Sequence, residues 1–290
     1  MKYKISNDGL KFEADSLGAE PMSIQTVHDP VEFLWQGDAR YWSRHAPILF
    51  PIVGALENDQ YTLHGLKYEL KQHGFARDSE FEMIERTENS LRFRLKENPQ
   101  TLKKFPFPFE LSTAYRLQEN SIVIEHHLVN PGQEVMWFSI GEHPGFNCPL
   151  SAGERMEDYS LVFEQAERLD RRFLEKGLLT SKREPFLVNE KRVRLSEGLF
   201  ERKAIILEKV KSRSVSLVSR NHSRKVTVTL EGYPYLGIWS PAKGASFVCI
   251  EPWQGVASPE DSDGDITHKP GILSLEPGKT FQCGYRIIID

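Results

Sequence analysis

The amino-acid sequence predicts an all-β protein, built as a large antiparallel β-sandwich with very little helix. Apolar and polar residues alternate with a period of two along much of the chain, as expected of strands with one buried and one solvated face. Turn-forming residues separate the alternating segments, and no long helical pattern lies between them. Strands in such succession favour stacked antiparallel sheets over a β-α-β fold.

The alternation is clearest in residues 80–83, 91–95, 122–128 and 226–230. Turns are predicted at residues 119–120, 130–132, 241–244 and 277–278. Helical signals are confined to two short segments. Asn98 and Pro99 are suited to begin a helix that extends through Lys104, and a single helical turn is expected between Ser196 and Glu201.

The composition indicates a soluble protein, and we expect one domain spanning residues 1–290, because sandwiches of this length often fold as one unit. The net charge of −4, with acidic and basic residues interspersed, argues against a nucleic acid or a membrane as partner. Without a signal peptide or a membrane-spanning stretch, a cytoplasmic location is expected. Cys148, Cys249 and Cys283 are too few and too scattered for a disulfide framework or a zinc site.

Three segments interrupt the strand pattern by placing ionisable residues beside glycine, proline and aromatic residues. They are residues 72–77, 141–146 and 250–255. In the third, Glu251 shares a strand face with Phe247 and Cys249, and the other face is also apolar. A strand that is apolar on both faces is buried, and a carboxylate there is costly unless it is paired, protonated or in a cavity. Pro252 is expected to end the strand.

Desolvation raises the pKa of a carboxyl group, which suits Glu251 to general base catalysis near neutral pH. A buried glutamate that holds a loop through backbone amides explains the same spacing equally well. His143 follows the apolar strand pattern of residues 135–140. It is a candidate acid–base partner because imidazole exchanges protons near neutral pH. Spacing alone favours a histidine bonded within the turn, and His73 has the same two interpretations.

Together these segments resemble the aldose 1-epimerase (galactose mutarotase-like) family, in particular its bacterial LacX-like branch. The resemblance covers nearly the whole chain. It comprises residues 42–54, 73–77, 106–107, 141–146, 232–239 and 250–255, in the order in which the family carries them. It implies a galactose mutarotase-like supersandwich. It also implies interconversion of the α and β anomers of a free aldose such as galactose or glucose, with no metal and no cofactor.

By the same resemblance, Glu251 corresponds to the general base and His143 to the general acid. His73 corresponds to a histidine near the ring oxygen of the sugar, and Arg44 to a substrate-binding arginine. Opening a hemiacetal requires only that one proton leaves the anomeric hydroxyl while another reaches the ring oxygen, which a carboxylate and an imidazole can accomplish. A small-molecule sugar is therefore the expected partner, for a protein that is either a monomer or a homodimer.

Arg77 lies within a shared motif and is expected to support substrate binding, with Trp253 as a candidate apolar wall of the sugar site. The sequence departs from the family at Lys203, where an aspartate that bonds sugar hydroxyls is usual. This departure leaves two alternatives open: a non-catalytic carbohydrate-binding or sensing module, and a mutarotase for a phosphorylated or otherwise anionic sugar held by Lys203, Arg44 or Arg77. In a third interpretation the alignment slips, Lys203 points to solvent and Glu201 supplies the carboxylate.

Two further signals are discounted. Residues 261–265 resemble a calcium loop, but glycine and the acidic residues do not have the EF-hand spacing, so a solvated loop is expected. His126 shares a strand face with Ile122, Ile124 and Leu128, which predicts a hydrogen-bonded core histidine and not a metal ligand.

Overall fold

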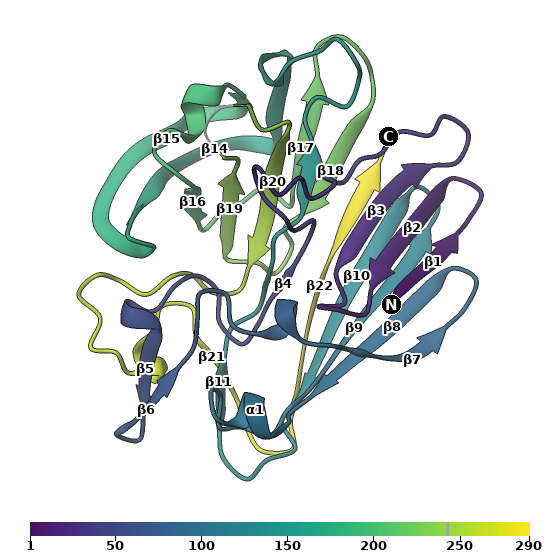
Figure 1. Cartoon of the computed structure of the whole chain (residues 1–290). Helices are drawn as coiled ribbons and strands as arrows, with labels where there is room; N and C mark the ends of the chain where they lie inside the picture. The colour runs from purple at the N-terminus through teal and green to yellow at the C-terminus, as the bar shows by residue number, and fades with distance from the viewer. Residues whose placement is uncertain (242–243) are drawn as a thin grey trace.

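Strands dominate the structure of the protein (Figure 1). The structure is a computed structural model that describes residues 1–241 and 244–290. The predicted turn at residues 241–244 therefore lies partly outside the described residues. The first strands are β1 (Lys2–Ser6), β2 (Leu10–Asp15), β3 (Pro21–Thr26), β4 (Ile48–Leu49), β5 (Gln60–Leu63), β6 (Leu66–Glu69), β7 (Glu82–Arg86), β8 (Ser90–Lys96), β9 (Glu110–Gln118), β10 (Ser121–Val129) and β11 (Met136–Phe138). The second half contains β12 (Gly141–Glu142), β13 (Gly145–Asn147), β14 (Tyr159–Glu175), β15 (Leu178–Arg194), β16 (Ile205–Glu208), β17 (Ser214–Ser219), β18 (Lys225–Thr229), β19 (Tyr235–Trp239), β20 (Phe247–Trp253), β21 (Leu273–Leu275) and β22 (Thr280–Ile289).

Helical structure in the described part of the chain is limited to α1 (Pro99–Leu102) and to five 3₁₀ turns. The turns are Glu57–Asp59, Ala76–Asp78, Met156–Asp158, Glu197–Phe200 and Ile266–His268. As predicted, Asn98 caps α1, because its side chain accepts hydrogen bonds from the backbone N–H groups of Gln100 and Thr101 at 2.8 and 3.0 Å. None of the described helices is long and apolar enough to cross a membrane.

An antiparallel sheet of 15 strands runs through the molecule. Its order is β4-β12-β20-β19-β16-β14-β17-β18-β22-β10-β9-β8-β7, with β13 paired to β20 and β15 paired to β14. Figure 1 shows β14, β16, β19 and β20 on one side of the molecule and β7 to β10 on the other, with β22 between them. The C-terminal strand therefore joins the two parts of the sheet.

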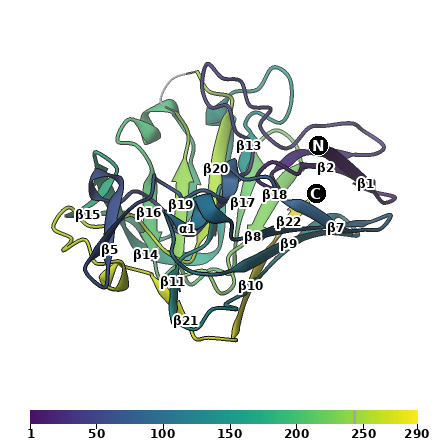
Figure 2. The same ribbon diagram turned by 60° about the horizontal axis from the view of Figure 1, so that its bottom comes forward.

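The three-stranded sheet β1-β2-β3 forms a second layer over the part of the large sheet that contains β8 and β9 (Figure 2). The ring centroids of Phe12 and Tyr115 lie 5.1 Å apart between the layers, and those of Tyr3 and Phe93 lie 5.6 Å apart. The hydroxyl of Tyr115 also donates to the backbone carbonyl of Ala19 at 2.6 Å. Aromatic packing across the two layers explains why the strand patterns have one apolar face.

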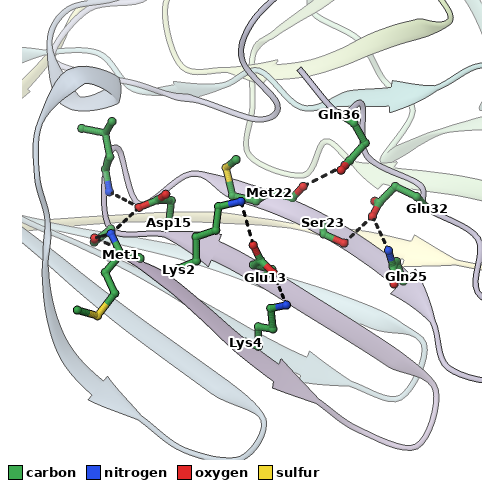
Figure 3. Close-up of polar contacts among 12 residues, drawn as sticks. Met1, Lys2, Lys4, Glu13, Asp15, Met22, Ser23, Gln25, Glu32 and Gln36 are labelled. Atoms are coloured by element: carbon green, nitrogen blue, oxygen red, sulfur yellow. Dashed lines mark hydrogen bonds and ion pairs between the residues drawn. The ribbon is translucent and has the colours of Figure 1, made fainter. Parts of the chain in front are cut away.

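Figure 3 shows the polar contacts made by the N-terminal sheet and the segment that follows it. Lys2 and Lys4 flank Glu13 with N···O distances of 3.3 and 3.0 Å. Glu32 accepts a hydrogen bond from the side chain of Gln25 at 3.1 Å. Ion pairs of exposed lysines contribute little stability, about 0–1 kcal/mol each. The apolar contacts beneath the sheet therefore hold this layer in place.

The predicted strands are confirmed, and the alternation is clearest in β8. Leu91, Phe93 and Leu95 of β8 are buried, and residues 122–128 lie within β10. The predicted all-β fold with very little helix is thus correct. Burial follows the period of two in β8, whereas Val123 of β10 and Thr227 of β18 are buried on the face expected to be solvated.

The prediction that Pro252 ends its strand is wrong, because β20 continues to Trp253. The backbone N–H groups of Ile250 and Gln254 donate toward the β12–β13 side of β20, at 3.2 and 2.8 Å. The nitrogen of Pro252 lies between them and faces the place where His143 interrupts the neighbouring strand. No hydrogen bond of the sheet is lost there, so the proline is tolerated within the strand.

Candidate active site

A cavity of about 380 Å³ lies against the part of the sheet formed by β12, β20, β19 and β16. The lining combines residues of these strands with loops and with the tip of the β14–β15 hairpin. The lining residues are Trp42, Gly54, Gln72, His73, Arg77, His143, Leu174, Gly177, Lys203, Ala204, Ile206, Trp239, Glu251, Trp253 and Ala257. Pockets of this size commonly hold small molecules.

Glu251 projects into the cavity from β20, a strand whose seven residues are all buried. Its side chain is only 1 % exposed. Gly237 of β19 pairs with Glu251 of β20, and a Cβ atom at Gly237 would lie 2.5 Å from the ring of Trp253. The absence of a side chain at this glycine thus allows the indole of Trp253 to pack beside the carboxyl group.

His143 directly follows β12, and its Nε2 lies 3.2 Å from Oε2 of Glu251. The rings of Trp42 and Trp239 enclose the imidazole, with centroid distances of 4.8 and 5.7 Å. The backbone N–H of His143 donates to the carbonyl of Pro47 at 3.2 Å. The structure therefore brings together the two residues predicted as acid and base, and both side chains are largely buried.

Glu142, the residue before His143, is fully buried and anchors this segment to the far part of the sheet. Its Oε1 lies 2.8 Å from Nε2 of His126, and its Oε2 accepts a hydrogen bond from the hydroxyl of Tyr285 at 3.0 Å. Nδ1 of His126 lies 3.0 Å from the hydroxyl of Thr113. His126 is thus the hydrogen-bonded core histidine predicted from the sequence, and this network fixes the strand that presents His143.

His73 lies in a tight turn with φ +66°, followed by Gly74 at φ +68°. A Cβ atom at Gly74 would lie 2.3 Å from the carbonyl oxygen of Phe50, so only glycine fits there. Nδ1 of His73 accepts a hydrogen bond from the backbone N–H of Gly54 at 3.1 Å. Since the neutral ring carries a single proton, that proton is on Nε2, which lies 3.1 Å from the side-chain amide of Gln72.

Burial shifts the pKa of each of these groups toward the uncharged form. It raises the pKa of the Glu251 carboxyl well above its ordinary value and lowers the pKa of His143 to about 3. It also lowers the pKa of His73 well below its ordinary value, with the neighbouring His143 and Arg77 adding to the effect. Both shifts within the contacting pair favour a carboxylic acid beside a neutral imidazole, so the pair holds one proton.

The comparisons with known proteins show the family and the fold. The model of the aldose 1-epimerase family matches residues 1–271. The chain belongs to this family. The plasmid-encoded protein LacX of Lactococcus lactis subsp. lactis is 37% identical over 298 residues, covering 100% of this chain and 99% of that protein.

Solved structures of two lactobacillar proteins share the fold. A galactose mutarotase related enzyme from Lactobacillus acidophilus has 39% sequence identity and a TM-score of 0.96, covering 100% of this chain and 97% of that chain. A galactose mutarotase-like protein from Lactobacillus casei has 31% identity and a TM-score of 0.91, covering 100% of both chains. The predicted family, its LacX-like branch and the galactose mutarotase-like fold are thereby confirmed.

The other predicted site residues of this aldose 1-epimerase family member are divided between the cavity and its surroundings. Arg77 and Trp253 line the cavity. Arg44 does not belong to the lining, because its guanidinium is bonded to the turn that carries Arg77. It donates to the carboxylate of Asp78 at 2.5 Å and to the backbone carbonyl of Arg77 at 3.2 Å.

Lys203 lines the cavity, whereas Glu201 does not. Lys203 follows the 3₁₀ turn Glu197–Phe200 and has φ +65°. Lys203 precedes β16, which lies on one side of β20, the strand of Glu251. The turn of Arg77 contacts Phe50 beside β4, on the other side of β20. The cavity of this family member thus has a cation on each side of the central carboxyl group.

Several lining residues were not predicted. Trp42 and Trp239 lie inside the motifs that carry the family resemblance, but sequence reasoning did not single them out. Leu174 and Gly177 come from the tip of the β14–β15 hairpin. The backbone N–H of Leu179 donates to the carbonyl of Ser258 at 2.9 Å, which fixes the tip over the cavity. No local pattern reveals such a long-range contact.

Lys269 lies entirely outside the predicted site and supports it from beneath. Its buried ammonium group bonds to the backbone carbonyls of Val53, at 3.0 Å, and of Val256. Burial lowers the pKa of Lys269 to about 7. Because Gly54 and Ala257 line the cavity, these bonds join two of its loops.

The loop at residues 261–265 uses its acidic groups locally. Asp263 pairs with His268 at 2.7 Å, and Asp265 accepts a hydrogen bond from the backbone N–H of Thr267 at 2.9 Å. Within the described residues the one set of three potential metal ligands that lie together is His143, Cys249 and Glu251.

Proposed function

We propose that the protein is an isomerase, an aldose 1-epimerase that interconverts the α and β anomers of a free aldose such as galactose or glucose. The 3.2 Å contact between His143 and Glu251 in a sugar-sized cavity carries this proposal. Anomer interconversion moves only protons and rotates one bond. Two proton-transfer groups that face the same ligand are the machinery it needs.

The reaction begins with one proton on the pair. Passing this proton from Glu251 to His143 gives a carboxylate and an imidazolium. Glu251 then removes the proton of the anomeric hydroxyl while His143 protonates the ring oxygen, and the ring opens to the aldehyde. Rotation about the bond between the first two carbons presents the other face of the aldehyde. Reverse transfers close the ring, and each positioned group contributes roughly 10²–10⁴-fold.

The surrounding residues bind and orient the sugar. His73, whose Nε2 contacts the side-chain amide of Gln72 at 3.1 Å, lies on the ring-oxygen side, and Arg77 donates to hydroxyl groups. The indoles of Trp42, Trp239 and Trp253 provide apolar walls for the carbon-bound hydrogens of the sugar. Arg44 acts through Arg77, because it holds the turn in place without lining the cavity.

The rate is expected to depend on pH as a bell-shaped curve. As pH falls through the pKa of His143, about 3, a second proton enters the pair and no acceptor remains. As pH rises through the elevated pKa of Glu251, the shared proton is lost and no donor remains. The measurement is kcat/KM by polarimetry after subtraction of uncatalysed mutarotation, with circular dichroism to confirm folding at each pH. A decline on acidification through the ordinary glutamate pKa would contradict this assignment.

A mutarotase for phosphorylated or otherwise anionic sugars is a second candidate. Lys203 supports it, since this cation lines the cavity where the family usually carries an aspartate. Polarimetry of freshly dissolved α-glucose, α-galactose and glucose 6-phosphate, with and without the protein, tests both candidates. Failure to accelerate any of them would favour the non-catalytic sugar-binding module.

Activity is expected to survive exhaustive chelation, because opening a hemiacetal needs only proton movement. The test compares the rate before and after dialysis against EDTA. Loss of activity that calcium restores would contradict the expectation and would direct attention to residues 261–265.

We further propose that the single domain works in the cytoplasm, as a monomer or homodimer without a cofactor.

A further inference from the structure

Three side chains that can ligate a metal ion lie together, His143 and Glu251 in the lining of the cavity and Cys249 beside them. One ligand atom each from His143, Cys249 and Glu251 lies within 4.8 Å of the other two. The sheet explains this arrangement, since Cys249 and Glu251 are two residues apart on β20 and share a face. His143 reaches the same place from the neighbouring strand β12. The wide separation of these residues in the sequence hides the grouping from any spacing motif.

Two of the three groups, Cys249 and Glu251, are buried, and one of them has an oxygen without a hydrogen-bond partner in the described part of the chain. Oε2 of Glu251 accepts no hydrogen bond of good geometry from any described residue. The thiol of Cys249 is fully buried beside that oxygen. A bound cation compensates for both features, because coordination displaces the protons of the thiol and the carboxyl group.

We infer that His143, Cys249 and Glu251 form a binding site for a thiophilic divalent cation such as Zn²⁺, which inhibits the enzyme reversibly. Zinc binds sulfur at about 2.3 Å and nitrogen or oxygen at about 2.0–2.2 Å, so tetrahedral ligand atoms lie roughly 3.3–3.7 Å apart. The His143–Glu251 distance of 3.2 Å lies just below this range. Only the thiol of Cys249 has to approach, and the fourth position faces the cavity.

The ion is an inhibitor because it occupies the acid and the base together. With Nε2 of His143 and the carboxylate of Glu251 coordinated, neither group can exchange a proton with a sugar. A thiolate ligand favours Zn²⁺ over Mg²⁺ and Ca²⁺, which prefer oxygen ligands. Inhibition rests on the proposed epimerase function, whereas binding of the ion does not.

Binding is tested first by calorimetric titration of Zn²⁺ into the metal-free protein. We expect one site, and Cys249→Ser should weaken Zn²⁺ at least about 10-fold, the lower end of the cost of disturbing even the surroundings of a metal site. Cys283→Ser is the matched control, since that cysteine lies on β22 outside the cavity and its replacement should leave the affinity unchanged. Co²⁺ should give a thiolate-to-metal charge-transfer band that Cys249→Ser abolishes.

Inhibition is tested on the same variants, each relative to its own metal-free rate. Zn²⁺ should slow anomer interconversion by the parent protein, EDTA should restore the rate, and Cys249→Ser should need at least about 10-fold more Zn²⁺. Equal Zn²⁺ affinity in the parent and Cys249→Ser, or a Co²⁺ spectrum without the thiolate band, would overturn the site. If the parent is inactive on every sugar, the calorimetry and the Co²⁺ spectrum still decide whether the metal site exists. If Cys249→Ser does not fold, Cys249→Ala replaces it.

Discussion

Glu251→Gln and His143→Asn are each expected to lower the rate of anomer interconversion by roughly 10²-fold or more, at the lower end of what one general acid or base contributes. Glutamine preserves the shape of the glutamate but cannot take up a proton. Asparagine can still donate a hydrogen bond but cannot deliver a proton to the ring oxygen. Because the two side chains lie 3.2 Å apart and share one proton, the double variant should be little slower than either single variant.

Matched controls make the same chemical changes on the surface. Glu125→Gln and His127→Asn alter an exposed carboxylate and a half-buried imidazole of β10, outside the cavity. Both should retain the parent rate, measured by polarimetry of fresh α-galactose and α-glucose. Parent-like rates in Glu251→Gln and His143→Asn would show that the acid–base assignment is wrong.

Lys203→Asp is expected to improve turnover of galactose and to weaken binding of anionic sugars. An aspartate accepts hydrogen bonds from sugar hydroxyls, whereas a lysine only donates them. A charge-assisted bond between lysine and a phosphate or carboxylate is stronger than a neutral one, so its loss should be visible in the binding of glucose 6-phosphate. The measurement compares kcat/KM and Kd for galactose and glucose 6-phosphate in parent and variant.

Glu201→Ala provides the comparison that isolates the effect of Lys203. Glu201 is an exposed residue two positions away and does not line the cavity. Glu201→Ala should leave kcat/KM and Kd for both classes of sugar unchanged. If Lys203→Asp is silent and Glu201→Ala abolishes use of galactose, then Lys203 is a surface residue and the carboxylate of Glu201 contacts the sugar.

The sequence predicted those parts of the fold and site that are encoded locally. Alternation in residues 91–95 and 122–128 follows directly from the pleat of a strand, so strand identity and the buried face were accessible. The contact between His143 and Glu251 was not accessible from spacing. It depends on β12 and β20 lying side by side, and only the family resemblance pointed to it.

The remaining features depend on contacts between distant segments. Pro252 was expected to end its strand because proline cannot donate a backbone hydrogen bond. The sequence does not show that the partner strand is interrupted at that position, so this expectation failed. Arg44 was expected at the sugar, but it bonds the turn of Arg77. Leu174, at the tip of the β14–β15 hairpin, became a cavity wall through the packing of that hairpin. Side-chain chemistry is readable from a sequence, but the neighbours of a side chain are set by tertiary structure.

The central position of β22 has a consequence for folding. This strand is the last in the chain, yet it pairs with β10 on one side and with β18 on the other. Without residues 280–289, the edges of β10 and β18 have no partner strand, and unpaired edges can associate with other chains. The two parts of the sheet are therefore joined only by pairing between residues far apart in the sequence, the kind of contact that slows folding.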